Sequence, residues 1–155
     1  MSKKHRFNHY AIMDSETANG IVEEDGKLNL RFSLVYDLAV AIIDKRGRMY
    51  DAKRFICDEI FHSPLMCTAY YHDKIPQYIE AINRGEMEVV SIIEMYYRVR
   101  EFLKLYDVKA IMAHNARFDV NALNNTLRYL SGSDKRFFLP YGLEVWDTQK
   151  MAHDT

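Results

Sequence analysis

The sequence predicts an α/β domain with a mixed sheet, in which an antiparallel hairpin near the N-terminus is followed by alternating helices and strands. The first observation is a pair of β-branched and apolar runs, over 33–44 and 49–57, joined by a short turn that contains Gly47. The second is the recurrence of apolar residues at helical spacing later in the chain. With 155 residues and 48% hydrophobic residues, the chain suits one domain, 1–155, with a real core.

The first half of the chain reads as three strands. Phe7–Asp14 is nearly continuous in apolar residues, as expected of a buried strand. Asn19–Gly20 predicts a turn, and 23–27 a polar loop. The two hairpin strands follow over 33–44 and 49–57.

The second half alternates helices and strands. Pro76 and Gly85 bracket a predicted helix over Ile75–Asn83. Ser91 and Glu94 have the spacing of a capping box, and apolar residues then recur at helical intervals as far as Tyr106. On that helix Tyr96, Tyr97 and Tyr106 are expected in the core. The remaining predicted elements are a strand Lys109–Ala113, a helix Asp119–Leu130, a strand Leu143–Trp146 and the start of a helix at Thr148–His153.

Two acidic motifs follow two of these strands. Asp14 and Glu16 come at the end of the first, and because residues two apart in an extended segment share a face, they can present two carboxylates to one point. Asp119 follows the strand that ends at Ala113. Carboxylate oxygens at the carboxyl ends of strands suit a hard divalent cation. The alternative is local: Asp14 and Glu16 form a turn, and Asn115 and Asp119 cap a helix.

These motifs resemble those of the DEDD superfamily of DnaQ-like 3′→5′ exonucleases, whose first motif is Asp-x-Glu and second is Asn-x-x-x-Asp. Here they are Asp14-Ser15-Glu16 and Asn115-Ala116-Arg117-Phe118-Asp119, the second preceded by His114. The resemblance implies an RNase H-like fold and two-metal hydrolysis with Mg²⁺ or Mn²⁺ at the 3′ end of single-stranded DNA or RNA. It implies that the metal ligands and catalytic residues are Asp14, Glu16 and Asp119, and that the substrate contacts are Thr17, His114, Asn115 and Phe118.

The sequence departs from the family in its third motif. The family's last catalytic Asp lies on a C-terminal helix, after a His five residues earlier or a Tyr four residues earlier, and no free Asp in this chain has that setting. Asp147 is expected to cap the helix that begins at Thr148. The final helix is therefore expected to be missing, with weak or no activity. The alternative is a non-catalytic exonuclease-like module that binds nucleic acid or a polymerase partner, and exposure of the sheet predicts self-association.

Net charge, cysteine content and the distribution of apolar and aromatic residues limit the possible partners and location of the protein. A formal net charge of −1 gives no global positive field for nucleic acid, so affinity for phosphate must come from bound metals and local cations. The candidate cations are expected to be solvated hairpin charges: Lys45, Arg46, Arg48, Lys53 and Arg54. Cys57 and Cys67 lack metal-ligand spacing and are expected to be buried thiols. No membrane-spanning or signal segment is visible, which predicts a cytoplasmic protein. The aromatic-rich segment Phe61–Tyr78 reads as a loop anchored by its rings or as a substrate-contacting insertion.

Overall fold

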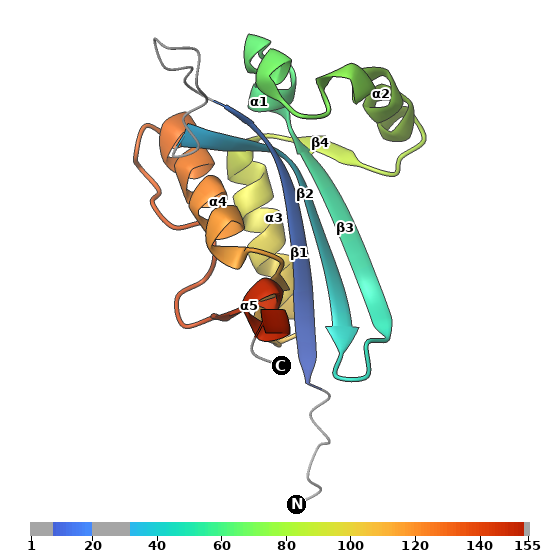
Figure 1. Cartoon of the computed structure of the whole chain (residues 1–155), viewed down its shortest axis with the longest axis vertical. Helices are drawn as coiled ribbons and strands as arrows, with labels where there is room; N and C mark the ends of the chain where they lie inside the picture. The colour runs from blue at the N-terminus through green and yellow to red at the C-terminus, as the bar shows by residue number, and fades with distance from the viewer. Residues whose placement is uncertain (1–7, 20–31, 154–155) are drawn as a thin grey trace, which may run out of the picture.

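The computed structural model describes residues 8–19 and 32–153, and within them the chain folds around a six-stranded sheet (Figure 1). The strand order is β4-β3-β2-β1-β5-β6. The strands are β1 His9–Asn19, β2 Ser33–Asp44, β3 Met49–Cys57, β4 Glu88–Val90, β5 Val108–Ala113 and β6 Glu144–Asp147. The helices and 3-10 turns are α1 Asp58–Phe61, η2 Pro64–Thr68, η3 His72–Lys74, α2 Ile75–Asn83, α3 Ile92–Leu105, α4 Ala116–Ser131 and α5 Thr148–His153.

The sheet is mixed, as the sequence predicts. β1 pairs antiparallel with β2, and β2 with β3, while β5 is parallel to both β1 and β6. The short β4 adds a parallel edge strand beside β3. The 33–44 and 49–57 hairpin is confirmed, and so is the alternation of helix and strand after it. The architecture is a six-stranded α/β sheet with flanking helices, consistent with the RNase H-like exonuclease fold.

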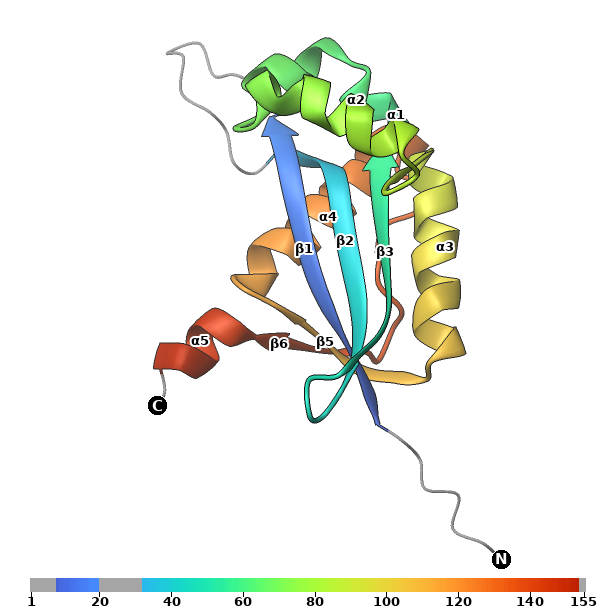
Figure 2. The same ribbon diagram turned by 90° about the vertical axis from the view of Figure 1, so that its right-hand side faces the viewer.

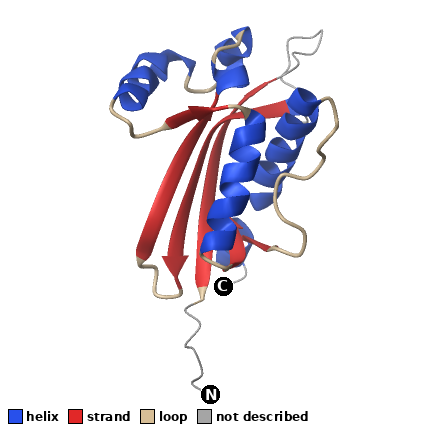
Figure 3. Cartoon of the chain, turned by 180° about the vertical axis from the view of Figure 1, so that it is seen from behind, coloured by secondary structure: helices blue, strands red, loops and turns tan. Residues whose placement is uncertain are grey.

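The helices cover one face of the sheet more fully than the other. α3 and α4 lie against the same face (Figures 1 and 3), where Ala11 and Met13 of β1 are buried opposite Ile42 and Val40 of β2. Side chains alternate along a strand, so Ile12 points to the other face, where it is 43% exposed. α1 and α2 lie at the end of the sheet where β1 and β3 terminate (Figure 2).

β1 is longer than the sequence predicts. The expectation that the strand ends at Asp14 is wrong, because β2 continues to pair with β1 as far as Asn19 opposite Ser33. The turn predicted at Asn19–Gly20 begins at the last residue of β1 and otherwise lies outside the described residues. A register shift between Glu16 and Thr17, where Tyr36 of β2 is an extra residue, interrupts the pairing without ending the strand. Phe7, Gly20 and the expected loop over 23–27 lie outside the described residues.

Three smaller expectations also change. α4 begins at Ala116 rather than at Asp119, because the backbone turns into the helix directly after Asn115. Tyr97 is 51% exposed, so it is not a core residue, although Tyr96 and Tyr106 pack against the core. Cys67 is exposed because it lies on η2, where Met66 is the residue that turns inward, whereas Cys57 is buried as expected.

The remaining helix predictions hold. α2 spans the predicted 75–83, and Ser91 Oγ accepts a hydrogen bond of 3.1 Å from the Glu94 amide, as a capping residue should. Segment 61–78 is not a loop but a succession of η2, η3 and the start of α2. Within the described residues, no helix is both long and apolar enough to cross a membrane.

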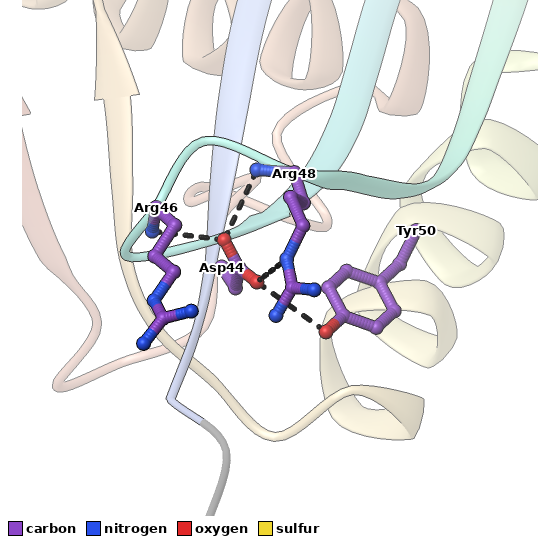
Figure 4. Close-up of polar contacts among 4 residues, drawn as sticks. All are labelled: Asp44, Arg46, Arg48 and Tyr50. Carbon is purple, nitrogen blue, oxygen red and sulfur yellow. Dashed lines mark hydrogen bonds and ion pairs between the residues drawn. The ribbon is translucent and has the colours of Figure 1, made fainter.

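The β2–β3 hairpin is closed by one aspartate. Asp44 Oδ1 accepts hydrogen bonds from the amides of Arg46 and Arg48 at 2.8 and 3.0 Å (Figure 4). Its other oxygen accepts from Arg48 Nε at 2.9 Å and from the Tyr50 hydroxyl at 3.4 Å. Burial opposes ionisation of Asp44, but the bonds from Arg48 and Arg46 outweigh it and lower the pKa of the carboxyl. Arg48 is therefore a structural cation of the turn.

Candidate active site

Asp14 and Glu16 project from the same face of β1. Residues two apart in a strand share a side, and the pairing with β2 is regular through this stretch, with Asp14 opposite Ala39 and Glu16 opposite Asp37. This is the face that α3 and α4 leave open. Asp14 is exposed and Glu16 is half-buried, so both carboxylates are accessible to solvent.

Asp119 approaches the same stretch of β1 along the edge of the strand. It is buried in the first turn of α4. β5 pairs with β1 no further than Ile12, so the edge of β1 beyond that residue is available on this side. The Asp119 carboxylate takes up that position and accepts a hydrogen bond from the Ser15 hydroxyl. The structure thus brings both acidic motifs to one short stretch of β1.

The pKa values of Glu16 and Asp119 are both raised. Burial raises the pKa of Asp119, and the charge of Asp14 raises it further, against hydrogen bonds from Ser15 that lower it. Burial likewise raises the pKa of Glu16, with Asp14 and Asp37 adding to the effect. A raised carboxyl pKa means that the ionised form is poorly compensated where it stands. This stretch of β1 therefore has unbalanced negative charge.

A buried ion pair beside Glu16 is a feature that the sequence interpretation missed. Asp37 is 3% exposed and accepts hydrogen bonds from Arg54 Nε and Nη2 at 3.0 and 2.6 Å. The Tyr78 hydroxyl donates a further bond of 2.9 Å to the same carboxylate. The hydrogen bond to Asp37 raises the pKa of Arg54, and the Arg54 charge partly lowers that of Glu16.

The expectation of a solvated hairpin charge is therefore wrong for Arg54. The signal was present in the sequence: Asp37 interrupts an otherwise apolar run over 33–44, and an acid buried in a central strand needs a partner. Arg54 lies beside Ala39 on the neighbouring strand, two residues from Asp37 on the same face. Only the strand register identifies it as that partner.

A pocket of about 270 Å³ opens next to Glu16. Its lining combines an acid, two cations and two phenol rings: Glu16, Arg54, Tyr71, Lys74, Gln77, Tyr78 and Met87. Lys74 Nζ lies 4.8 Å from the centroid of the Tyr71 ring, and it forms no ion pair with any described residue. Part of the aromatic segment 61–78 thus faces the acidic stretch of β1.

Asp147 organises the start of α4 from the end of β6. Its carboxylate accepts hydrogen bonds from the amides of Asn115 at 3.1 Å and Ala116 at 3.2 Å. It also accepts from the Gln149 amide at 3.0 Å, which confirms the predicted cap of α5. Burial opposes ionisation, but these backbone bonds outweigh it and lower the pKa of Asp147. These hydrogen bonds join the end of β6 to the start of α4, whose first turn carries Asp119.

The other residues implied by the resemblance lie around these acids without a shared contact. Asn115 adopts a left-handed backbone with φ of 59° and makes no side-chain cap of α4, so the capping alternative does not hold for its side chain. His114 is exposed, with Nδ1 3.5 Å from the Thr148 hydroxyl. Phe118 is half-buried next to Asp119, and Thr17 is half-buried directly after the register shift, at which Tyr36 of β2 is left without a partner in β1.

The donor set suits a divalent cation, although the side chains do not converge on one point. Within 8–19 and 32–153, no three His, Cys, Asp or Glu side chains are close enough to hold a metal ion as they stand. The available donors near Asp14 are carboxylate oxygens, the ligands that Mg²⁺ and Mn²⁺ prefer. Mg²⁺ also takes few protein ligands and keeps waters and substrate oxygens. Burial is the main cause of the raised pKa values of Glu16 and Asp119, and a cation here would balance the neighbouring negative charges that raise them further.

Comparison with known proteins identifies the fold through structure and not through sequence. No protein-family model matches the chain, and no curated protein is similar to it in sequence. Among solved structures, product-bound exonuclease I matches with a TM-score of 0.62 at 15% identity, over 94% of this chain and 31% of that chain. A complex described as ExoI/SSB-Ct matches with a TM-score of 0.61 at 16% identity, over 95% and 30%.

Exonuclease I of E. coli in complex with a dT13 oligonucleotide matches with a TM-score of 0.53 at 13% identity, over 95% of this chain and 29% of that chain. The chain therefore spans less than a third of the length of these structures. At this identity the likeness concerns the fold alone. The chain folds like part of a nuclease, with the RNase H-like architecture expected from its two motifs.

Proposed function

We propose that this chain acts as the nuclease domain of a metal-dependent 3′→5′ exonuclease, which hydrolyses phosphodiester bonds at the 3′ end of single-stranded DNA or RNA. The observation that carries the proposal is the gathering of Asp14, Glu16 and Asp119 on one stretch of β1 with unbalanced negative charge. The likeness to exonuclease I, one of whose structures holds an oligonucleotide, supports it.

Asp14 and Glu16 would hold Mg²⁺ or Mn²⁺ from the open face of β1, and Asp119 from the edge of the strand. When bound, two such ions activate a water and stabilise the leaving 3′ oxygen. Ser15 keeps the Asp119 carboxylate at the edge of β1 by its hydrogen bond. Arg54 limits the rise in the pKa of Glu16 and so favours the ionised ligand at neutral pH.

The substrate strand would approach over the pocket beside Glu16. Lys74 provides a cation for a phosphate and Tyr71 a ring for a base, both in the pocket lining. Thr17, Asn115, Phe118 and His114 are proposed to contact the 3′-terminal nucleotide from the other side of the acids. In this arrangement, α2 and η3 contact one side of the substrate strand, and the start of α4 contacts the other side.

The test compares metal binding and strand shortening in matched variants. Wild-type protein should bind Mn²⁺ weakly in calorimetry and shorten a 5′-labelled oligonucleotide slowly from its 3′ end, with cleavage blocked by a 3′-terminal phosphorothioate. Asp14→Asn should abolish both, because it removes a ligand of the proposed ions. Glu101→Gln, which removes a charge from an exposed site on α3, should change neither. Equal activity in Asp14→Asn and wild type would falsify the proposal.

A second candidate is a non-catalytic module that binds nucleic acid or a polymerase partner. It is favoured by the lack of a three-ligand metal cluster within the described residues. The same assays separate the two: a module should bind the oligonucleotide in EDTA and leave it intact with Mn²⁺, and its affinity should not change in Asp14→Asn. Mn²⁺-dependent shortening that requires Asp14 excludes the module.

A further inference from the structure

A second charged and aromatic surface lies away from the acidic stretch of β1, on the outer side of α3. Two adjoining hollows of about 750 and 530 Å³ run between α3 and the 132–143 connection, and both are lined by Arg100, Pro140, Tyr141 and Gly142. We call this surface the back groove. Figure 3 shows α3 and the connection from this side, with the sheet behind them.

The back groove is a built surface, because the connection that forms its wall is fixed in place. Arg100 donates hydrogen bonds of 3.0 Å to the carbonyl oxygens of Phe137, Phe138 and Leu139. Its guanidinium also lies 4.3 Å from the centroid of the Tyr96 ring. Phe138 is fully buried, and its amide donates to Asn124 Oδ1 at 2.9 Å. Arg100 therefore uses its donors to hold the connection in place, so any ligand of the groove would be bound by other cations.

Positive charge is concentrated in the groove, although the formal net charge of the chain is −1. Lys104, Lys135 and Arg136 line it and form no ion pair with any residue that the structure describes. The acids in the lining are Asp107, which pairs with Lys109 at 2.9 Å, and Asp134. An excess of cations in a concave surface attracts a polyanion.

Exposed rings accompany these cations. Tyr141 is fully exposed, at 106%, and Phe137 is 64% exposed. Lys135 Nζ lies 5.2 and 5.3 Å from the centroids of Tyr96 and Tyr97, so a cation and two rings form one cluster at the end of the groove. Alternation of cations and exposed rings along a groove is the arrangement by which proteins hold single strands without sequence preference.

We propose that the back groove binds single-stranded nucleic acid, with Lys104, Lys135 and Arg136 contacting phosphates and Tyr141 stacking on a base. Asp14 and Glu16 project from the face of the sheet that α3 and α4 leave open, whereas the back groove lies between α3 and the 132–143 connection, on the other side of the sheet. Binding in the groove therefore needs neither a metal nor an intact active site. The groove would be a second binding site for single-stranded nucleic acid, separate from the proposed catalytic site.

The test measures the affinity of the whole chain for a fluorescent oligothymidine by anisotropy, in EDTA. The double variant Lys135→Ala/Arg136→Ala should weaken binding and reduce the slope of log affinity against log salt by about 1.4, the value for two lost phosphate contacts on a single strand. Tyr141→Ala should weaken binding about 5- to 150-fold, the range for loss of one stacked base. Asp14→Asn should leave this binding unreduced, which separates the groove from the proposed active site.

Matched controls make the result specific. Lys45→Ala/Arg46→Ala removes the same charge from the exposed tip of the hairpin and should leave the salt slope unchanged. An oligonucleotide with 5-iodouracil should cross-link at Tyr141 or Phe137 under ultraviolet light. Two results would overturn the proposal: equal loss of affinity in the hairpin and groove variants, or polyglutamate competing as well as oligothymidine with no effect of Tyr141→Ala. The latter would indicate an acidic protein partner.

Discussion

At Asp119, ligand chemistry and stability are opposed. Because burial raises the pKa of this carboxyl in the folded protein, the ionised form is stabilised less by the fold than by water. The free energy of unfolding is therefore higher at low pH, where Asp119 is protonated. It falls as the pH rises through the raised pKa of Asp119, and it remains lower at neutral pH. A bound cation would offset this cost, because a nearby positive charge stabilises the ionised form of a buried carboxyl such as Asp119.

Asp119→Asn should therefore stabilise the metal-free protein at neutral pH. The amide oxygen can still accept the hydrogen bond from Ser15, while the uncompensated charge is removed. We expect an increase of about 1 kcal/mol in the free energy of unfolding, or about 2–4 °C in Tm. Thermal melts in EDTA at neutral and acidic pH check this, since the gain should vanish when Asp119 is protonated. A loss of stability at both pH values would mean that the Ser15 contact outweighs the charge.

Arg54→Ala should destabilise the fold because it leaves the buried Asp37 carboxylate with the Tyr78 hydroxyl but without its cation. We expect a loss of about 2–3 kcal/mol, less than for a fully buried pair because the Arg54 side chain is 41% exposed. Urea unfolding measures it.

The matched control for this pair is Arg84→Ala. Arg84 pairs with Glu86 where both side chains are more than half exposed, so its loss should change stability by no more than about 0.5 kcal/mol. A second readout tests the link to the site: without Arg54 the pKa of Glu16 should rise further, and Mn²⁺ binding should shift to higher pH. Equal effects of the two substitutions would show that the Asp37 pair adds nothing to stability.

At the scale of elements, Asp147 joins three of them. One carboxylate accepts amide hydrogen bonds at the start of α4 and at the start of α5, from a position at the end of β6. Its charge also contributes to the raised pKa of Asp119. The end of β6 therefore influences both the placement of α4 and the charge state of its first acid.

Asp147→Ala should cost about 2 kcal/mol, the upper range for loss of a helix cap, because amides at two helix starts lose their acceptor. Hydrogen exchange should speed up at Asn115, Ala116 and Gln149 and remain unchanged in the middle of α3. Asp147→Asn, which keeps one acceptor oxygen, should show a smaller loss. If both variants exchange like wild type at these amides, the α4 start is held by packing alone.

The elements were predictable from sequence where their patterns are local. The 33–44 and 49–57 hairpin follows from apolar runs around a Gly turn, and α2 and α3 follow from Pro76 and the Ser91 cap, all read within a few residues. The end of β1 was not predictable, because its extension to Asn19 is set by pairing with β2, a contact between distant segments. The exposure of Cys67 was not predictable for the same reason, because it depends on which side of η2 packs against the core.

For the candidate site, the acidic motifs could be identified from sequence, but not their supports. Ser15 on Asp119 joins residues 104 positions apart in the chain, and Arg54 meets Asp37 across strands. Neither contact has a local pattern. The pocket lined by Glu16 and Lys74 likewise forms only when α2 and η3 lie across the end of the sheet. Spacing in sequence identifies the chemistry, whereas register and layer packing identify the neighbours that tune it.

At the scale of the molecule, charge differs between the open face of the sheet and the side that carries the helices. Acids lie along β1 and β2, where Glu16 and Asp37 stand directly opposite each other, and three cations without an ion pair to any described residue, Lys104, Lys135 and Arg136, line the back groove. A net charge near zero thus hides two local fields of opposite sign. A polyanionic strand is drawn to one side and repelled from the other until a cation neutralises the acids.

The open face of the sheet leads to the last prediction. Ile12 is 43% exposed and lies in register between Ala41 and Met112, with Trp146 next to Met112 and 5.4 Å from the ring of Tyr10. This apolar strip lies beside Asp14 on the side that α3 and α4 leave uncovered. Contiguous exposed apolar surface favours association, so we expect the chain to self-associate as its concentration rises.

Ile12→Lys should abolish that self-association with a change in stability of no more than about 0.5 kcal/mol, because an exposed position accepts a charge without burying it. The control is Leu105→Lys, which changes an apolar residue that is 75% exposed at the end of α3, on the other side of the sheet from the strip, and should leave association unaltered. Sedimentation velocity over a range of protein concentrations measures both. Wild type that remains monomeric throughout, or a loss of association in both variants, would exclude the strip as the contact surface. Because the strip lies beside Asp14, association should also slow the proposed nuclease activity, since a second copy would cover the carboxylates that the proposed substrate must reach.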